Sequence, residues 1–600
     1  MTTDSHSAGR ADLRGNDDRV VGLTRLVIGL VQGVALYLLF RTTQGERGAT
    51  WSSLHPEAFT PMVLVALFLP PVLLAGVGRL RWLTLGVWGV VAAAALAFLG
   101  WHDIARQAGE AGREATSPLF AFSAAALFIA HHLIVPADRE RKLIASYPAY
   151  FDAAWMAGVQ LALSIAFAGA FWLLLFLGAA LFKVIGLTFL GDLINQTWFS
   201  FPLTGLAFAT AVHLTDVRDG LIRGVRTIAL MLLSWLLLVL TVLVAGFLLA
   251  LPFTGLDGLW ETGNATALVL AAAGGMIILI NAAYQDGRPD NLPPAVLRVA
   301  VRVAAVLVTP LIGIAVWGLS LRIGQHGLTP DRIIASACAL VGAAYALGYG
   351  LGALVPFFRK GSPWMKALET TNIAAAVLVV GVILALFTPI ADPARLSVND
   401  QMARLENGKV APDRFDYRFL KFGSGKLGQA ALARLVASDD PETARRAREA
   451  SKAEYPYEID PVEPAFTPVV EAWPADRPLP PTFTAPFTGP GVLKGCEKRG
   501  DCLATLRDLN GDGAPEILLA SSAGLFLFAA DVNGGWTEEG SYMVLRCPGE
   551  DTEPDARQLM RSGSLEPRTA AWPDLDTGGR FTSSLTNTAP CRRAEAAPAR

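Results

Sequence analysis

The stretch RTIALMLLSWLLLVLTVLVAGFLLALPFTGLD (residues 226–257) holds 30 uncharged residues between its first arginine and its last aspartate. A helix needs about 20 apolar residues to cross the hydrocarbon core of a bilayer. A buried helix of a soluble protein could explain one such segment, but not eleven. The other ten lie within residues 20–40, 57–79, 81–103, 114–138, 152–183, 192–216, 261–286, 302–322, 332–359 and 369–392. The pattern predicts a mainly α fold: a polytopic transmembrane helix bundle of about eleven spans over residues 20–391, followed by a small extracytoplasmic α+β domain.

The composition excludes several classes of protein. Charged residues make up 17% of the 600 residues, against roughly 25% in soluble proteins. Hydrophobic residues make up 52%, and the mean hydropathy is +0.42. This excludes a soluble enzyme, a disordered chain and a nucleic-acid-binding protein. Residues 1–391 carry 25 Lys/Arg and 21 Asp/Glu, whereas residues 392–600 carry 25 and 31, which indicates a bilayer part followed by a water-facing part.

Lysine and arginine in the short loops indicate the orientation. If residues 1–19 form a cytoplasmic tail, the cytoplasmic segments hold 17 Lys/Arg and the opposite loops hold 7. Cytoplasmic loops carry the excess of positive charge in membrane proteins, which favours this assignment. An odd number of spans then places the chain from residue 392 onward outside the cytoplasm. No small-residue cleavage site follows the first apolar run, so we expect an uncleaved anchor.

The water-facing part divides into four predicted regions. Residues 392–454 have helical periodicity. Ten prolines crowd residues 455–492, which predicts an extended linker or a loop laid over the next unit. Residues 493–550 alternate apolar and polar side chains around NGDG and NGG turn signals, a pattern typical of strands. Residues 551–600 are polar and rich in Pro and Ala, and they are predicted to be disordered unless Cys591 ties them back.

Four of the five cysteines lie in the water-facing part: Cys496, Cys502, Cys547 and Cys591. This usage fits an oxidising compartment. Three pairings are possible, and we favour Cys496–Cys502 with Cys547–Cys591 because short loops close at low entropic cost. Four free thiols are the alternative, and the absence of a CxxC pair disfavours zinc.

The segment DLNGDGAPE (residues 508–516) is the sharpest motif in the chain. Asp508, Asn510, Asp512 and Glu516 place oxygens at positions 1, 3, 5 and 9, a pattern suited to Ca²⁺. Leu519 stands where an EF-hand has its bidentate glutamate, so the loop is not an EF-hand. It resembles a single integrin-type (FG-GAP/VCBS-like) calcium loop. The alternative is a hairpin turn stabilised by Asx hydrogen bonds without a metal.

Polar residues within the spans are functional candidates. His213 and Asp216 are three residues apart and share one face of a helix. They could form a proton relay or an ion site, or they could belong to a solvated helix end, which their position at the cytoplasmic end of a span favours. Gln160 and Asn281 lie within spans, where hydrogen bonding between helices is the expected role.

Five stretches of sequence resemble a multi-pass bacterial inner-membrane family that is catalogued as a domain of unknown function. The resemblance covers about residues 150–435 and implies the inner (plasma) membrane of a Gram-negative envelope. It implies no catalytic or cofactor-binding residues. The stretches are FWLLLFLGAALFKVIGL (residues 171–187), LPFTGLDGLW (251–260), INAAYQDG (280–287), RIGQHGLTPDRI (322–333) and LSVNDQMARLENGKVAPDRFDYRFLKF (396–422).

The motifs favour a binding, sensing or scaffold function in the cell envelope. The chain has no GxSxG, HExxH, Walker or dinucleotide-binding motif, so we expect no enzymatic activity. The expected partners are the lipid bilayer and envelope proteins, not nucleic acid. One alternative is a transporter of small molecules or lipids, which the missing internal repeat disfavours. Another is an enzyme for lipid-linked substrates, with phosphates held by Arg218, Arg223 and Arg226.

Overall fold

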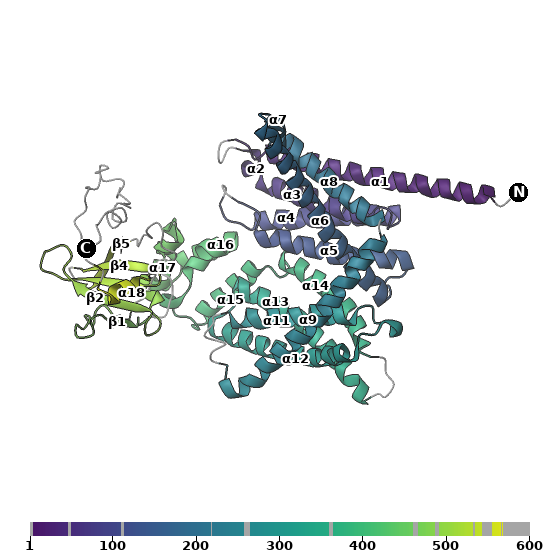
Figure 1. Cartoon of the computed structure of the whole chain (residues 1–600). Helices are drawn as coiled ribbons and strands as arrows, with labels where there is room; N and C mark the ends of the chain where they lie inside the picture. The colour runs from purple at the N-terminus through teal and green to yellow at the C-terminus, as the bar shows by residue number, and fades with distance from the viewer. Residues whose placement is uncertain are drawn as a thin grey trace, which may run out of the picture. The chain divides into compact units, whose positions relative to one another are not determined.

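The chain forms two compact units, each of which is described by itself. In the computed structural model the membrane unit comprises Met1–Ala411 and Phe419–Asp440, and the C-terminal unit comprises Pro412–Arg418 and Pro441–Arg600. Helices make up the membrane unit, and the C-terminal unit contains a sheet (Figure 1). The structure describes residues 4–45, 50–109, 113–217, 219–256, 264–358, 364–459, 466–486, 491–531, 534–542, 555–563, 565 and 567.

Ten helices of the described chain are long and apolar enough to cross a membrane. They confirm ten of the eleven predicted segments. The N-terminal residues from Asp4 onward are helical and continuous with the first candidate span, Arg19–Arg41. The ten helices are α1 (Asp4–Arg41), α3 (Pro56–Gly76), α4 (Trp82–Ala105), α5 (Ser117–Glu140), α6 (Tyr147–Val184), α9 (Asp219–Thr254), α11 (Ala265–Tyr284), α12 (Ala295–His326), α13 (Pro330–Phe358) and α14 (Ala367–Leu386), with short α2 (Trp51–Leu54) and α7 (Phe189–Ile194) between them.

The eleventh predicted segment, residues 192–216, forms part of α7 and the 21-residue helix α8 (Thr197–Val217). Helix α8 is not among the ten because serine, threonine, proline and histidine dilute its apolar residues. It packs antiparallel against α1, and the two helices lie side by side in Figure 1. Gly29 and Gly205 face each other so closely that a Cβ atom on either would collide with the backbone of the other. Such small-residue contacts are typical of membrane helices. Helix α8 therefore packs along a candidate span, and the eleventh span stays a prediction.

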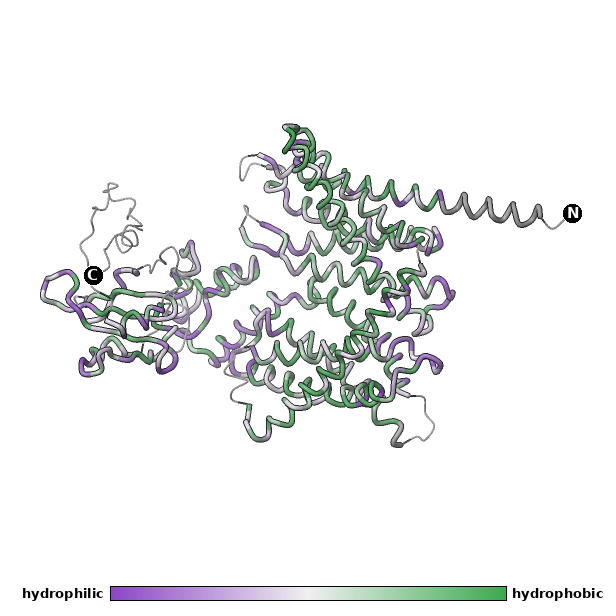
Figure 2. Tube along the Cα trace, viewed as in Figure 1, coloured by the Kyte–Doolittle hydropathy of each residue, from purple (hydrophilic) through white to green (hydrophobic). Residues whose placement is uncertain are grey.

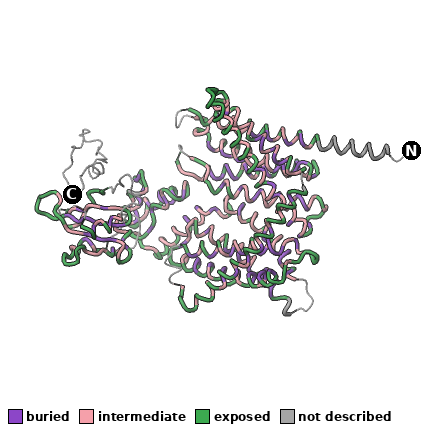
Figure 3. Tube along the Cα trace, in the orientation of Figure 1, coloured by how far each residue is buried: buried purple, intermediate pink, exposed green. Residues whose placement is uncertain are grey.

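Apolar side chains cover the outside of the membrane unit. Its helices are largely hydrophobic in Figure 2, and exposed residues follow the same helices in Figure 3. On α6, Leu173 is 71% exposed, and on α9, Val242 and Leu243 are both 63% exposed. Exposed leucine and valine in such numbers suit contact with lipid tails, so the membrane unit is built for a bilayer.

Two helices that follow the last span belong to the membrane unit. The carboxylate of Asp400 accepts the backbone N–H of Leu328 at 2.7 Å, and Lys426 N–H donates to the carbonyl of Arg106 at 3.0 Å. Both helices therefore satisfy backbone groups at the ends of spans, and the structure divides the predicted helical region 392–454 after Asp440. The helices are α15 (Pro393–Glu406) and α16 (Gly425–Val436), whereas α17 (Pro441–Lys452) belongs to the C-terminal unit.

The C-terminal unit contains a five-stranded sheet in the order β1-β2-β3-β4-β5. Strand β1 pairs with β2 in parallel, and the later pairs are antiparallel. The central strand β3 is buried on both faces, as its apolar run EILLAS indicates. The strands are β1 (Val470–Ala472), β2 (Cys502–Arg507), β3 (Glu516–Ser521), β4 (Gly524–Ala530) and β5 (Trp536–Tyr542).

The two faces of β3 pack against different parts of the chain. Ile517 and Leu519 belong to a cluster with the two buried cysteines Cys496 and Cys502. Leu518 and Ala520 face the opposite cluster, which includes side chains of helix α18 (Ala556–Arg561). Two predicted regions therefore contribute to this unit beyond their expected roles. Strand β1 lies in the predicted linker, and α18 lies in the tail predicted to be disordered.

Candidate functional site

The DLNGDGAPE segment forms the turn between β2 and β3. The strand ladder pairs Arg507 with Glu516, so residues 508–515 form the loop. Gly511 and Gly513 adopt φ angles of +80° and +86°, a region that other residues rarely enter. These two glycines allow the loop to curl around its own acidic side chains.

Three carboxylates meet in this loop. Asp508, Asp512 and Glu516 each offer one oxygen, and these oxygens lie within 4.8 Å of one another. Glu516 is buried at the start of β3, whereas Asp508 and Asp512 are exposed. Carboxylate oxygens are preferred ligands of Ca²⁺, so the arrangement suits a hard cation that approaches from solvent.

The fourth predicted ligand, Asn510, hydrogen-bonds within the loop. Its Oδ1 accepts the N–H of Asp512 at 2.8 Å, and its Nδ2 donates to Asp512 Oδ2 at 2.9 Å. Asp508 accepts the N–H groups of the two loop glycines at 2.7 and 3.0 Å. The N–H of Ala514 donates to Asp512 and lowers the pKa of that carboxyl. The loop therefore forms Asx turns. Its carboxylate oxygens still have lone pairs that are free to bind a cation.

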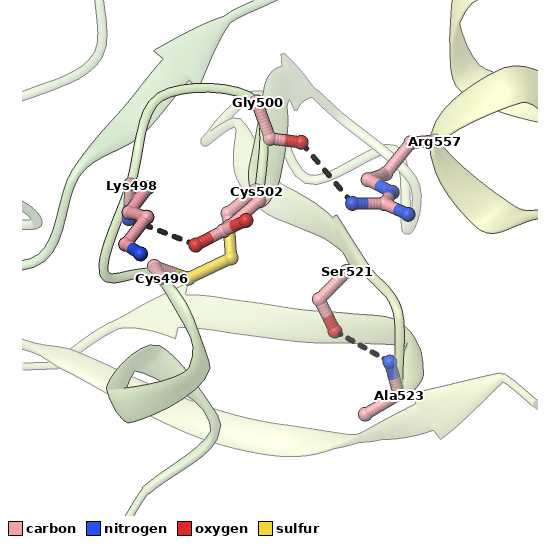
Figure 4. The surroundings of a disulfide bond; sticks show 8 residues. Cys496, Lys498, Gly500, Cys502, Ser521, Ala523 and Arg557 are labelled. Carbon is pink, nitrogen blue, oxygen red and sulfur yellow. Dashed lines mark hydrogen bonds between the residues drawn. A yellow bond between two sulfur atoms is a disulfide. The ribbon is translucent and has the colours of Figure 1, made fainter. Parts of the chain in front are cut away.

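A disulfide joins Cys496 and Cys502 ahead of strand β2, as predicted, with their Cα atoms 5.3 Å apart (Figure 4). Both cysteines are fully buried. Arg557 of α18 donates to the carbonyl of Gly500 in the loop that the disulfide closes, at 3.2 Å. The disulfide and the hydrogen bond from Arg557 therefore both hold this loop in place. The predicted partners Cys547 and Cys591 lie outside the described residues, so their pairing stays a prediction.

Asp216, one of the two predicted intramembrane residues, lies in a partly buried ionic cluster. Its carboxylate accepts hydrogen bonds from Arg25 on α1 and from Arg79. Arg79 lies in the turn after α3 and also donates to Gln160 of α6 at 3.0 Å, so the cluster joins α1, α6 and α8 with this turn. His213 lies one turn away against Gly22 of α1. The charged partners of Asp216 favour a structural role for this aspartate. The proton relay or ion site, the alternative that the sequence favours less than a solvated helix end, stays a prediction.

A second polar cluster confirms the predicted hydrogen bonding between helices for Asn281 of α11, although sequence reasoning missed its partners. Tyr349 of α13 accepts from Asn281 Nδ2 and donates to Asn372 Oδ1, both at 2.8 Å. Asn372 Nδ2 in turn donates to Asn281 Oδ1 at 2.7 Å. The three side chains therefore close a ring of hydrogen bonds between α11, α13 and α14. Such a satisfied ring favours packing over solute binding.

A carboxylate lies beside this ring. Glu369 of α14 accepts from the hydroxyl of Tyr284 at 3.0 Å and pairs with Lys366 at 2.7 Å. The sequence contains a spacing that could have indicated both the ring and the carboxylate beside it. Asn281 and Tyr284 are three residues apart on α11, as Glu369 and Asn372 are on α14, so each pair shares a helix face.

The family model of a domain of unknown function, DUF4153, matches residues 61–437, more than half of the chain. The chain belongs to the DUF4153 family. The resemblance inferred from the sequence is therefore confirmed. No curated protein and no solved structure matches the chain.

The DUF4153 segment ends at residue 437, close to the boundary of the membrane unit at Asp440. It contains the ring of Asn281, Tyr349 and Asn372, together with Asp216. The loop at residues 508–516 and the whole sheet lie beyond it. The family segment therefore corresponds to the helices, and the acidic loop belongs to a part of this chain outside the match.

Proposed function

We propose that this multi-pass membrane protein is a binding, sensing or scaffold protein of the bacterial cell envelope, not an enzyme. In this proposal the bundle anchors the chain in the inner membrane, and the C-terminal unit lies in the periplasm and binds Ca²⁺ in the loop at residues 508–516. The observation that carries the proposal is the approach of three carboxylates within 4.8 Å in a loop closed by two strands. Envelope proteins are the proposed partners.

Two features support the periplasmic location. The 17-to-7 distribution of Lys/Arg in the loops favours a cytoplasmic N-terminus. The buried disulfide Cys496–Cys502 fits an oxidising compartment. A periplasmic reporter fused after Arg600 is expected to be active, and a cytoplasmic reporter at the same position is expected to be silent. The reverse result would contradict the proposed orientation.

The calcium proposal is tested on the full-length protein in detergent. Hydrogen exchange of the β2 and β3 peptides is measured while Ca²⁺ is titrated. A site that binds only the folded state adds about 2.7 kcal/mol at a hundred times its Kd, so exchange of both strands should slow. Mg²⁺ at the same concentration reports selectivity, because Mg²⁺ demands a tighter octahedral shell.

Two variants distinguish a metal site from a turn. Asp512→Ala removes one of the three carboxylates, so its strands should no longer respond to Ca²⁺. Asp531→Ala is the matched control, because Asp531 also accepts a backbone N–H in a hairpin turn, from Gly535 at 2.9 Å. This control should keep the wild-type response. Equal responses of wild type and Asp512→Ala would leave only a turn stabilised by Asx hydrogen bonds.

A further inference from the structure

A second candidate site lies in the membrane unit, between α5 and α14. A cavity of about 1210 Å³ opens there, larger than the roughly 300–1,000 Å³ of common small-molecule pockets. Aliphatic side chains of both helices line its length: Leu133 and Ile134 of α5, and Ile373, Ala374 and Val377 of α14. The cavity is therefore an apolar groove that runs along two candidate spans.

The groove has charged side chains at the helix ends. Arg81, Arg141 and Lys142 line it with one carboxylate, Asp138, so three cations face one anion. Asp138 is engaged by Arg81 at 2.6 Å and by the hydroxyl of Thr84 at 2.7 Å. Arg141 makes no side-chain ion pair or hydrogen bond with any residue that the structure describes. With Glu140, which pairs with Lys142, the three cations at the mouth of the groove meet two carboxylates, so the mouth carries a net positive charge of one.

The segment that carries these cations is held in place. Arg141 adopts the left-handed conformation, with φ of +54°, at the end of α5. The N–H of Ala145 donates to the hydroxyl of Tyr150 at 2.9 Å, and Ser146 donates to Glu140 at 2.5 Å. Lys142 forms a salt bridge with Glu140 at 3.6 Å, and its side chain is 66% exposed. The left-handed conformation of Arg141 is a common way to end a helix, and it directs the chain that follows away from α5.

The same segment presents two apolar side chains outward. Leu143 is 95% exposed and Ile144 is 63% exposed, directly after the two cations. Both residues line the groove as well. Apolar side chains beside cations at the ends of spans suit the headgroup layer, where the former contact acyl chains and the latter contact phosphates.

We propose that this groove binds an anionic phospholipid of the adjacent leaflet. Arg141 and Lys142 contact its phosphate, and one acyl chain lies along Ile373, Ala374 and Val377. Two features of the groove favour this ligand. Its mouth carries a net positive charge, which suits an anionic headgroup, and its aliphatic lining suits an acyl chain. Basic pockets between membrane helices hold anionic headgroups by the same chemistry. The site is independent of the calcium loop.

The test uses the full-length protein in detergent and native mass spectrometry. Phosphatidylglycerol is compared with phosphatidylcholine of the same chain length. Each Lys/Arg near a headgroup contributes about fivefold to the affinity for an anionic lipid. The double variant R141A/K142A should therefore bind phosphatidylglycerol about 30-fold more weakly. R298A removes an exposed arginine of α12 outside the groove and should bind as wild type does.

A third variant tests the contact with the acyl chain separately from the contact with the headgroup. Ala374→Trp fills the groove from an exposed position and keeps every cation, so it should lose binding of both lipids. Inorganic phosphate at millimolar concentration should not displace phosphatidylglycerol. Equal binding of the two lipids by wild type, unchanged binding by R141A/K142A, or displacement by inorganic phosphate would each overturn the proposal.

Discussion

The membrane unit and the C-terminal unit place polar and apolar groups in opposite ways. Arg25 of the membrane unit is 1% exposed, whereas Leu173 is 71% exposed. In the C-terminal unit Leu519 and the disulfide cysteines are fully buried, and Asp508 and Asp512 of the acidic loop are exposed. The membrane unit therefore exposes apolar side chains, which suits contact with lipid, whereas the C-terminal unit buries them, which suits contact with water.

The comparison shows what stabilises each unit. Burial of apolar side chains such as Leu519 stabilises the C-terminal unit, because the transfer of apolar surface out of water is favourable. Lipid tails are as apolar as leucine, so the membrane unit gains little from burying such side chains. Its helices are joined instead by close glycine contacts and by polar clusters such as Asn281, Tyr349 and Asn372. The predictions below test this contrast, from the largest expected effect to the smallest.

Asp216→Ala should have the largest effect. It leaves Arg25 buried without its carboxylate, and loss of one partner of a buried ion pair costs about 3–5 kcal/mol. The free energy of unfolding is measured by denaturant titration of the purified protein. Asp192→Ala, which removes an exposed carboxylate of α7, is the control and should change it by less than about 0.5 kcal/mol. Similar losses for both variants would mean that the ionic cluster does not tie the helices.

Loss of the disulfide should have an intermediate effect, confined to the C-terminal unit. The double variant C496A/C502A opens a loop with a sequence separation of 6 residues, which costs about 2 kcal/mol by the chain-entropy model. Exchange of the β3 amides should then be roughly 30-fold faster. Peptides of α11 and α12 serve as the internal control. Faster exchange throughout the membrane helices would show that the two units do not unfold separately.

Tyr349→Phe should have the smallest effect. It removes the hydroxyl that joins Asn281 and Asn372, and hydrogen bonds between membrane helices contribute about 0.6 kcal/mol on average. The change in thermal stability is compared with that of Tyr345→Phe, one turn away on the same helix. A loss several times larger than the control's would show that the ring contributes more than ordinary membrane hydrogen bonds do. Equal stability of both variants would show that the ring contributes nothing.

Much of the membrane unit could be predicted from the sequence, because bilayer thickness sets the length of each apolar segment. Residues 226–257 illustrate this, since their uncharged run became most of α9. The turn at residues 508–516 could also be predicted, because its acidic side chains lie within nine residues, and three of them meet in the structure. Calcium binding by this loop stays a prediction. The role of Asp216 was not, since its partners Arg25 and Arg79 lie 191 and 137 residues away.

The sequence by itself determined which region suits lipid and which suits water, the position of ten candidate spans and the family. It favoured the cysteine pair six residues apart among three possible pairings. These properties depend on local composition and spacing, which can be read along the chain. Only the tertiary structure decided which polar residues meet. Asn281, Tyr349 and Asn372 come from three helices, and the groove between α5 and α14 joins segments more than 200 residues apart in sequence. Which helices lie side by side depends on packing between faces that local sequence describes only as apolar.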